Sequence, residues 1–154
     1  MPALSGGCAC GRVRYECEEV SIVDLICHCR DCQRPSGSAY SSMSVVPTDK
    51  LTLTRELKYY AIKGDSGGTM QRGFCPECGS PVAARKLETP VITFLQVASL
   101  DDPSKFSPTC EIFLSSAQPW HPTHGIASFE KGPSEDALVG RIAAYFAKRE
   151  ARIA

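Results

Sequence analysis

The chain has 154 residues, in which 17 lysines and arginines balance 17 aspartates and glutamates. This length fits one domain, 1–154, with a hydrophobic core of its own, and zero net charge excludes a general field that would recruit nucleic acid or an anionic membrane. No apolar run approaches the roughly 20 residues of a membrane-spanning helix, and the first residues form no secretory leader. We therefore expect a cytoplasmic protein whose thiols stay reduced and whose partners are neither nucleic acids nor membranes.

Along the chain, the residue pattern predicts many short strands separated by turns. Residues 6–11 form a glycine-flanked turn, 33–38 a loop and 64–68 a flexible turn. Alternating or β-branched segments predict strands over 12–17, 21–26, 40–46, 51–53, 57–62, 90–97 and 110–114. Cys17, on the first of these strands, is expected to be a core residue rather than a ligand.

One helix is expected near the C-terminus, over about 134–152. Ser134 can cap it, and Glu135 and Asp136 lie in its first turn, where the helix dipole favours acidic side chains. Apolar residues then recur at helical spacing. The predicted fold class is mainly β, with short-strand β-sheets stapled by zinc over a core of about 5–120 and a C-terminal α-helix.

Cysteine spacing is the strongest functional signal. Seven of the nine cysteines lie in three tight clusters, which are Cys8 with Cys10, Cys27 with Cys29 and Cys32, and Cys75 with Cys78. In a reducing compartment such clusters favour metal ligation over disulfides. Structural zinc takes four protein ligands, whereas catalytic zinc commonly keeps three and leaves one position open. Two pairs and one trio therefore predict one closed four-thiolate zinc site and one open three-thiolate site.

The order of these motifs resembles that of a known family. The motifs are Gly6–Tyr15, Cys27–Ser38 and Arg72–Ser80, followed by Leu100–Asp102 and Pro119–Trp120. Together they resemble the glutathione-dependent formaldehyde-activating enzyme family, which includes the centromere protein V domain, over roughly residues 5 to 120. The resemblance implies β-sheets around zinc, similar to the fold of certain Rab-binding zinc proteins.

The resemblance also implies two zinc ions per chain and a role for each cysteine cluster. Structural zinc would be held by Cys8, Cys10, Cys75 and Cys78, and catalytic zinc by Cys27, Cys29 and Cys32. The co-substrate would be glutathione or another small thiol, and its partner formaldehyde or another small electrophile. The chain departs from the family at Cys110, before Glu111, where many members carry histidine. Any help which that histidine gives in its relatives would be missing here.

An open three-thiolate zinc favours a carbon–sulfur lyase or thiol-adduct synthase. Thiolate ligands donate charge to zinc, so the metal acidifies bound water less than at a three-histidine site. A borderline-soft metal suits substrate sulfur, held as a thiolate that can add to an aldehyde to give a hemithioacetal. The carboxylates of glutathione would need cationic partners, and the candidates close in sequence to the cysteines are Arg30, Arg34 and Arg72.

The sequence leaves several alternatives open. The trio could be a structural zinc site completed by a fourth ligand, for which the candidates are His121, His124 and Cys110. A completed site would favour a zinc-stapled, non-catalytic protein-binding module. Each arginine could instead be a solvated surface residue or neutralise the anionic zinc sites. His28, between two cysteines, is expected to face away from the metal, either exposed or supporting the ligands, and Tyr40 and Trp120 are expected in the core.

Overall fold

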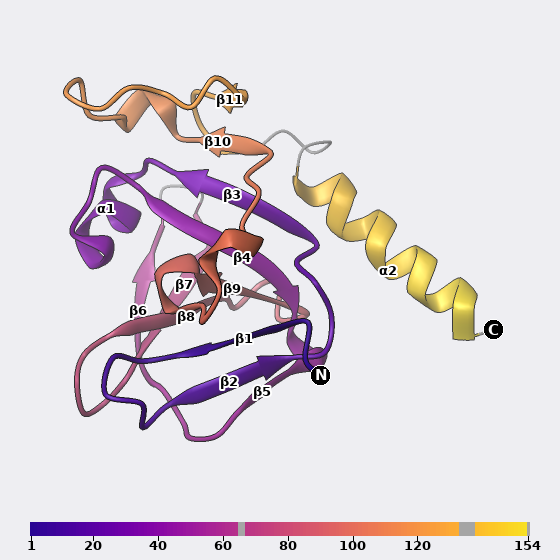
Figure 1. Ribbon diagram of the computed structural model, residues 1–154. Helices are drawn as coiled ribbons and strands as arrows, with labels where there is room; N and C mark the ends of the chain where they lie inside the picture. The colour runs from indigo at the N-terminus through magenta and orange to yellow at the C-terminus, as the bar shows by residue number, and fades with distance from the viewer. Residues whose placement is uncertain (65–66, 133–137, 154) are drawn as a thin grey trace.

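The structure is a computed structural model that describes residues 1–64, 67–132 and 138–153. Within these residues the strands form one sheet of three and one sheet of eight. Figure 1 shows the small sheet at the bottom, the large sheet above it and the C-terminal helix to the right. The prediction of a mainly β fold with a C-terminal helix is confirmed.

The small sheet is antiparallel and contains β1 (Leu4–Gly7), β2 (Arg14–Cys17) and β5 (Leu51–Leu53). The sequence predicted a turn from residue 6, but β1 continues through Gly7 before the chain turns. Gly6 pairs with Tyr15, and a Cβ at Gly6 would lie 2.2 Å from the Ser99 carbonyl oxygen. The glycine is therefore required by the close approach of the 3-10 turn that contains Ser99, which a single sequence does not reveal.

The large sheet has the strand order β11-β10-β3-β4-β9-β8-β7-β6. Its strands are β3 (Val23–Cys27), β4 (Ser41–Pro47), β6 (Lys58–Lys63), β7 (Thr69–Phe74), β8 (Pro81–Lys86), β9 (Ile92–Gln96), β10 (Cys110–Ile112) and β11 (Ala127–Phe129). β10 runs parallel to both β3 and β11, and the other pairs are antiparallel. The sequence did not predict β7, β8 and β11, whose alanines, glycine and polar residues carry little β propensity.

Helix α1 (Arg30–Ser36) corrects the predicted loop over 33–38. Pro35 and the serines suggested irregular backbone, yet the helix reaches Ser36 and ends at Gly37, which adopts the left-handed conformation (φ 61°). The Gly37 N–H donates to the Gln33 carbonyl at 3.0 Å, which satisfies a helix-end acceptor. The helix places Cys32, the last of the three clustered cysteines, shortly after the end of β3 at Cys27.

Helix α2 (Gly140–Ile153) lies within the predicted helical region of about 134–152, and the predicted cap at 134–136 lies outside the described residues. Ile142 and Phe146 pack against the large sheet's core. Tyr145 donates a hydrogen bond to Glu19, and Arg149 forms an ion pair with Asp49. Short 3-10 turns complete the secondary structure at η1 (Thr48–Lys50), η2 (Val97–Ser99), η3 (Pro103–Lys105) and η4 (Leu114–Ser116).

Two buried clusters lie on opposite faces of the large sheet. Val46 and Leu95 point into the first, which also contains Tyr15 of the small sheet. Val45 and Phe94, one residue away on the same strands, point into the second, which contains Cys27, Cys29 and Cys32. Because side chains alternate along a strand, central strands buried on both faces read as continuous apolar runs. The trio therefore lies in an apolar layer of its own.

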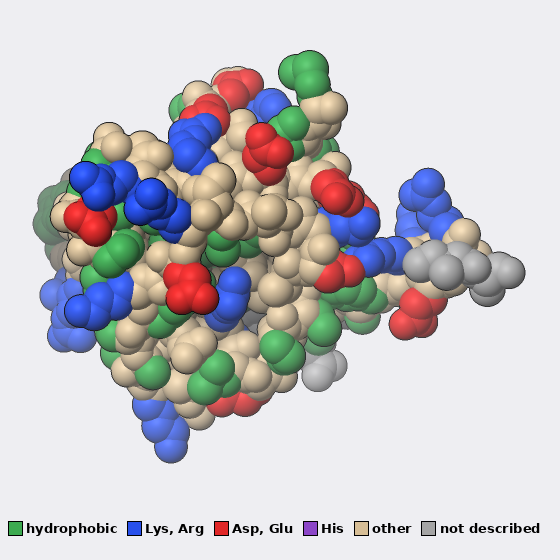
Figure 2. Space-filling model, turned by 90° about the horizontal axis from the view of Figure 1, so that it is seen from below, with side chains coloured by type: hydrophobic (Ala, Val, Ile, Leu, Met, Phe, Trp, Pro, Cys, Tyr) green, Lys and Arg blue, Asp and Glu red, His purple; other side chains and the backbone are tan. Residues whose placement is uncertain are grey.

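The surface is mixed in charge. Figure 2 shows basic and acidic side chains interspersed with apolar ones on the face seen from below, in keeping with the zero net charge. Among the described residues, no helix is both long enough and apolar enough to span a bilayer.

Candidate functional site

The structure brings the two cysteine pairs together. Cys8 and Cys10 lie in the turn between β1 and β2, and Cys75 and Cys78 in the turn between β7 and β8. The four sulfurs lie within 4.8 Å of one another and could hold a metal ion. The Cys8 and Cys10 sulfurs are 3.4 Å apart, and those of Cys10 and Cys75 are 3.8 Å apart. This group is called the paired-turn cluster below.

Both turns of the paired-turn cluster close in the same way. Gly11 follows Cys10 and Gly79 follows Cys78, each with a φ of 73°. The Gly11 N–H donates to the Cys8 carbonyl at 3.0 Å, and the Gly79 N–H donates to the Cys75 carbonyl at 2.9 Å. The left-handed conformation, which glycine adopts at no steric cost, lets each turn present two thiols to the same point.

Three of the remaining five cysteines form a second group, called the trio. Cys27 ends β3, Cys29 caps α1 and Cys32 lies in its first turn. All three are buried, their sulfurs lie within 4.8 Å of one another, and the Cys27 and Cys29 sulfurs are 3.4 Å apart. Within the described part of the chain, this group has no fourth histidine, cysteine, aspartate or glutamate. The structure thus gives no support to completion of the trio by a further side chain.

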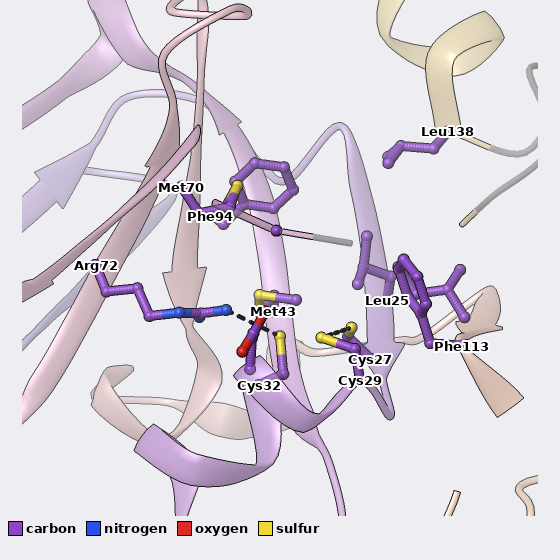
Figure 3. A pocket seen from close by; sticks show the side chains of 13 residues that line it. Leu25, Cys27, Cys29, Cys32, Met43, Met70, Arg72, Phe94, Phe113 and Leu138 are labelled. Atoms are coloured by element: carbon purple, nitrogen blue, oxygen red, sulfur yellow. Dashed lines mark hydrogen bonds between the residues drawn. The ribbon is translucent and has the colours of Figure 1, made fainter. Parts of the chain in front are cut away.

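Arg72 is the arginine that the structure places at the trio. It extends from β7, is buried, and its Nη2 lies 3.6 Å from the Cys32 sulfur (Figure 3). Hydrogen bonds from the Cys27 and Cys29 thiols, together with the Arg72 charge, lower the pKa of Cys32 to about 3. The neighbouring cation thus favours the thiolate form of Cys32.

A cavity of about 130 Å³ opens beside the trio. Figure 3 shows the cysteines on one side, Arg72 opposite Cys32, and Met70 and Phe94 above. Its apolar walls come from five strands, from the segment after β10 and from the start of the C-terminal helical region, and comprise Leu25, Met43, Met70, Phe94, Ile112, Phe113 and Leu138. A small molecule in this cavity would touch the trio directly.

Arg30 and Arg34 lie elsewhere. They line a separate depression with Gln33, Gln118 and Trp120. Arg30 donates a hydrogen bond to Gln33, and Arg34 lies 3.5 Å from the carboxylate of Asp31. Of the three arginines predicted to bind glutathione, Arg72 therefore lines the cavity at the trio, whereas the other two belong to the far side of α1.

The histidines gather in a place that sequence reasoning did not single out. The rings of His28, His121 and His124 surround Tyr40, with centroids 5.1 to 5.5 Å from the Tyr40 ring. Glu111 is fully buried beside them, and its Oε1 lies 2.9 Å from His28 Nε2 and 2.7 Å from His124 Nδ1. A glutamate inside a short apolar strand was the available signal, because a buried charge needs partners.

Burial would raise the pKa of Glu111, but hydrogen bonds from His124 and His28 outweigh it and lower that pKa.

His28 faces this glutamate rather than the trio, as expected, but it is buried, so the exposed alternative is wrong. The prediction that Trp120 lies in the core is also wrong, since its side chain is 69% exposed. Tyr40 is half-buried, and Cys17 is a core residue as predicted.

The family model for the glutathione-dependent formaldehyde-activating enzyme matches residues 3–116, which contain both cysteine groups. The chain belongs to this family. The match begins just before β1 and ends in η4, so it covers both sheets except β11 and excludes α2.

Fungal relatives in the family carry the same provisional name. One from Talaromyces marneffei is 34% identical over 84 residues, which is 51% of this chain and 44% of the relative. One from Emericella nidulans is 35% identical over 83 residues, or 51% and 42% of the two chains. The matches thus span less than half the length of these relatives.

Among solved structures, a Rhodobacter sphaeroides protein resembles the chain with a TM-score of 0.51 and 20% identity, covering 81% of this chain and 98% of that one. This likeness concerns the fold. Cys110, where the resemblance described above implies a histidine in many family members, is a buried residue of β10 that pairs with Leu25 of β3. The histidines of this chain lie around the neighbouring Glu111 instead.

Proposed function

We propose that the chain is a zinc-dependent enzyme of the carbon–sulfur lyase type. It would join glutathione or a similar small thiol to formaldehyde or another small electrophile. The proposal takes residues 1–154 as one functional unit in a cytoplasmic, thiol-reducing setting. The observation that carries it is the trio itself, since three cysteines without a fourth side-chain ligand among the described residues line a cavity that admits a small molecule.

The donor chemistry of both groups fits zinc. Four thiols at the paired-turn cluster match a closed structural site, whereas three at the trio match a site that keeps a position for substrate. Zinc bound at the trio would supply a coordination position that holds a thiol substrate as a thiolate at neutral pH. This division favours an enzyme over a protein-binding module.

The surrounding side chains support thiol addition. When a thiolate sulfur attacks a carbonyl carbon, a carbon–sulfur bond forms, the carbonyl π pair moves to oxygen and that oxygen takes up a proton. Arg72 places a permanent cation beside the thiolates and offers N–H donors to the developing negative charge. Its Nε has no hydrogen-bond partner among the described residues. The apolar walls exclude water, which strengthens these interactions.

The test compares catalysed with spontaneous addition, because thiols add to formaldehyde without help. Formation of the glutathione–formaldehyde adduct is followed by NMR exchange with zinc-loaded protein. Cys29→Ala should abolish the acceleration, whereas Cys17→Ala, which alters a buried cysteine outside both groups, should retain it. Equal rates with and without the wild-type protein would contradict the proposal.

A second readout reports on sulfur binding without turnover. Cobalt loaded at the trio should give a thiolate-to-metal absorption that changes with glutathione and stays unchanged with S-methylglutathione. A spectrum that ignores every thiol tried, from an occupied site, would rule out binding of substrate sulfur to the metal.

A further inference from the structure

The cavity at the trio is larger than formaldehyde needs. Its volume is about 130 Å³, and an apolar protein cavity of roughly 150 Å³ is enough to bind benzene. Formaldehyde, with one carbon and one oxygen, would leave most of this space without contacts. The volume instead matches a substituent of about six carbon atoms.

The chemistry of the walls points the same way. Two flexible thioethers, Met43 and Met70, and two aromatic rings, Phe94 and Phe113, face the cavity. Phe113 does so from a left-handed backbone conformation (φ 61°), which is a rare state for a bulky residue and one found mainly at functional sites. Such walls bind apolar groups, with roughly a fourfold gain in affinity for each buried methylene.

The charged residues that line the cavity at the trio are too few to bind the whole glutathione molecule there. Among the described lining residues, Arg72 is the single cation and Asp31 is an acid. Glutathione carries two carboxylates and two peptide groups, which need more partners than these. Arg30 and Arg34 line the other depression. The thiol's polar body must therefore remain outside, and the apolar walls are left for the electrophile.

Building on the proposed function, we propose that the electrophile is an aldehyde with an apolar substituent up to about the size of a phenyl ring. The substituent fills the space between the methionines and the phenylalanines, and the carbonyl carbon lies toward the trio. The thiolate sulfur bonds to that carbon, the carbonyl π pair moves to oxygen, and the oxygen takes the proton that the thiol releases. No further reactant is required.

Methionine labelling tests binding independently of turnover. The chain has three methionines, of which Met43 and Met70 line the cavity and Met1 is fully exposed. With ¹³C-methyl methionine, benzaldehyde and its unreactive analogue benzyl alcohol should shift the Met43 and Met70 signals and leave Met1 in place. Unmoved cavity signals at saturating probe, or equal shifts at all three, would overturn the proposal.

A cavity-filling variant tests specificity. Met70→Trp should lower the ratio of kcat/KM for benzaldehyde to that for formaldehyde at least tenfold, both with glutathione. Val91→Trp, which adds the same ring at an exposed position, should leave the ratio unchanged. An unchanged ratio in Met70→Trp would overturn the proposal.

The same assays separate this proposal from the one on which it rests. Acceleration of formaldehyde addition without acceleration of benzaldehyde addition overturns the apolar aldehyde and retains thiol-adduct synthesis. If benzyl mercaptan with formaldehyde is the favoured pair, the apolar group belongs to the thiol and the assignment is wrong. Acceleration of neither aldehyde, with either thiol, removes both proposals.

Discussion

Arg72 and Arg34 carry the same charge in opposite surroundings. Arg72 is buried against Cys32, whereas the Arg34 side chain is 71% exposed beside Asp31. Removing one partner of a buried charge contact typically costs about 2 kcal/mol or more of interaction free energy, which is a factor of roughly 30 in an equilibrium or rate constant. Arg72→Met should therefore reduce kcat/KM for thiol addition by about 30-fold, while Arg34→Met should change it less than twofold. Steady-state kinetics on both variants, at equal zinc content, measures the two changes in kcat/KM. Equal losses in both variants would contradict a special role for Arg72.

Glu111 is the most completely buried acid among the described residues, and its partners are two histidines. Glu111→Gln keeps the shape but removes the charge that both imidazoles contact. We expect a loss of about 3 kcal/mol in the free energy of unfolding, because the buried His28 and the more exposed His124 then lose their hydrogen bonds to a charged group. Denaturant unfolding measures the loss, and the exposed Glu56→Gln should stay within about 0.5 kcal/mol of wild type.

At the scale of elements, local signals predicted the strands well and the helix at the trio poorly. The run 90–97 was recognised because β9 consists of β-branched and apolar residues buried on both faces. Helix α1 was missed because its seven residues include Pro35, and its stability comes from Gly37 and from the burial of Cys32 and Gln33. The gathering of the histidines around Tyr40 depends on parallel pairing of β10 with β3, which local sequence does not encode.

Helix α2 depends on a few side-chain contacts, including the Arg149–Asp49 pair, in which Arg149 Nη1 lies 2.9 Å from Asp49 Oδ1. Its hydrogen bond lowers the pKa of Asp49 below the ordinary 3.8. Because the pKa of Asp49 is lowered in the folded protein, the ion pair stabilises the fold fully above pH 3.8. This stabilisation is lost as the pH falls through the pKa of Asp49 in the folded protein. Between pH 6 and pH 8 it should therefore be constant.

Asp49→Asn at pH 7 should loosen α2 by about 0.5 kcal/mol, which is typical of an exposed pair. Amide hydrogen exchange along the helix measures the change, which should shrink in high salt because the pair is screened. Asp102→Asn, on a distant 3-10 turn, is the matched control. Helix exchange that is identical in wild type and Asp49→Asn would show that the apolar contacts alone hold α2.

At the scale of the whole molecule, the two cysteine groups should differ in what they hold together. We expect about two zinc ions per chain by elemental analysis. Cys75→Ala should prevent stable folding, because the paired-turn cluster links the small sheet to the large one and metal binding there is folding energy. Cys29→Ala should retain the fold with one zinc. Equal loss of structure in both variants, followed by circular dichroism, would make the trio structural.

The cysteine spacing predicted which sulfurs could meet, because a metal brings clusters together whatever lies between them. It did not predict where the arginines go. Arg30 and Arg34 are closer in sequence to the trio than Arg72, yet Arg72 reaches it across the sheet from β7. Nor could it predict the cavity, whose walls come from strands that are distant in sequence. Distance along the sequence does not predict which residues contact each other where a β-sheet brings distant strands side by side.

With zinc bound as proposed, the paired-turn cluster would also set an order for metal capture during synthesis. Cys10 and Cys75 are 65 positions apart, whereas Cys27 and Cys29 are separated by two. At roughly 10 residues per second, the first pair waits several seconds for its partners. The trio leaves the ribosome within that interval. If the groups hold zinc as proposed, a nascent chain would pass through a period in which Cys8 and Cys10 share zinc with the wrong cysteines, and correct metal exchange would become a step in the maturation of this protein.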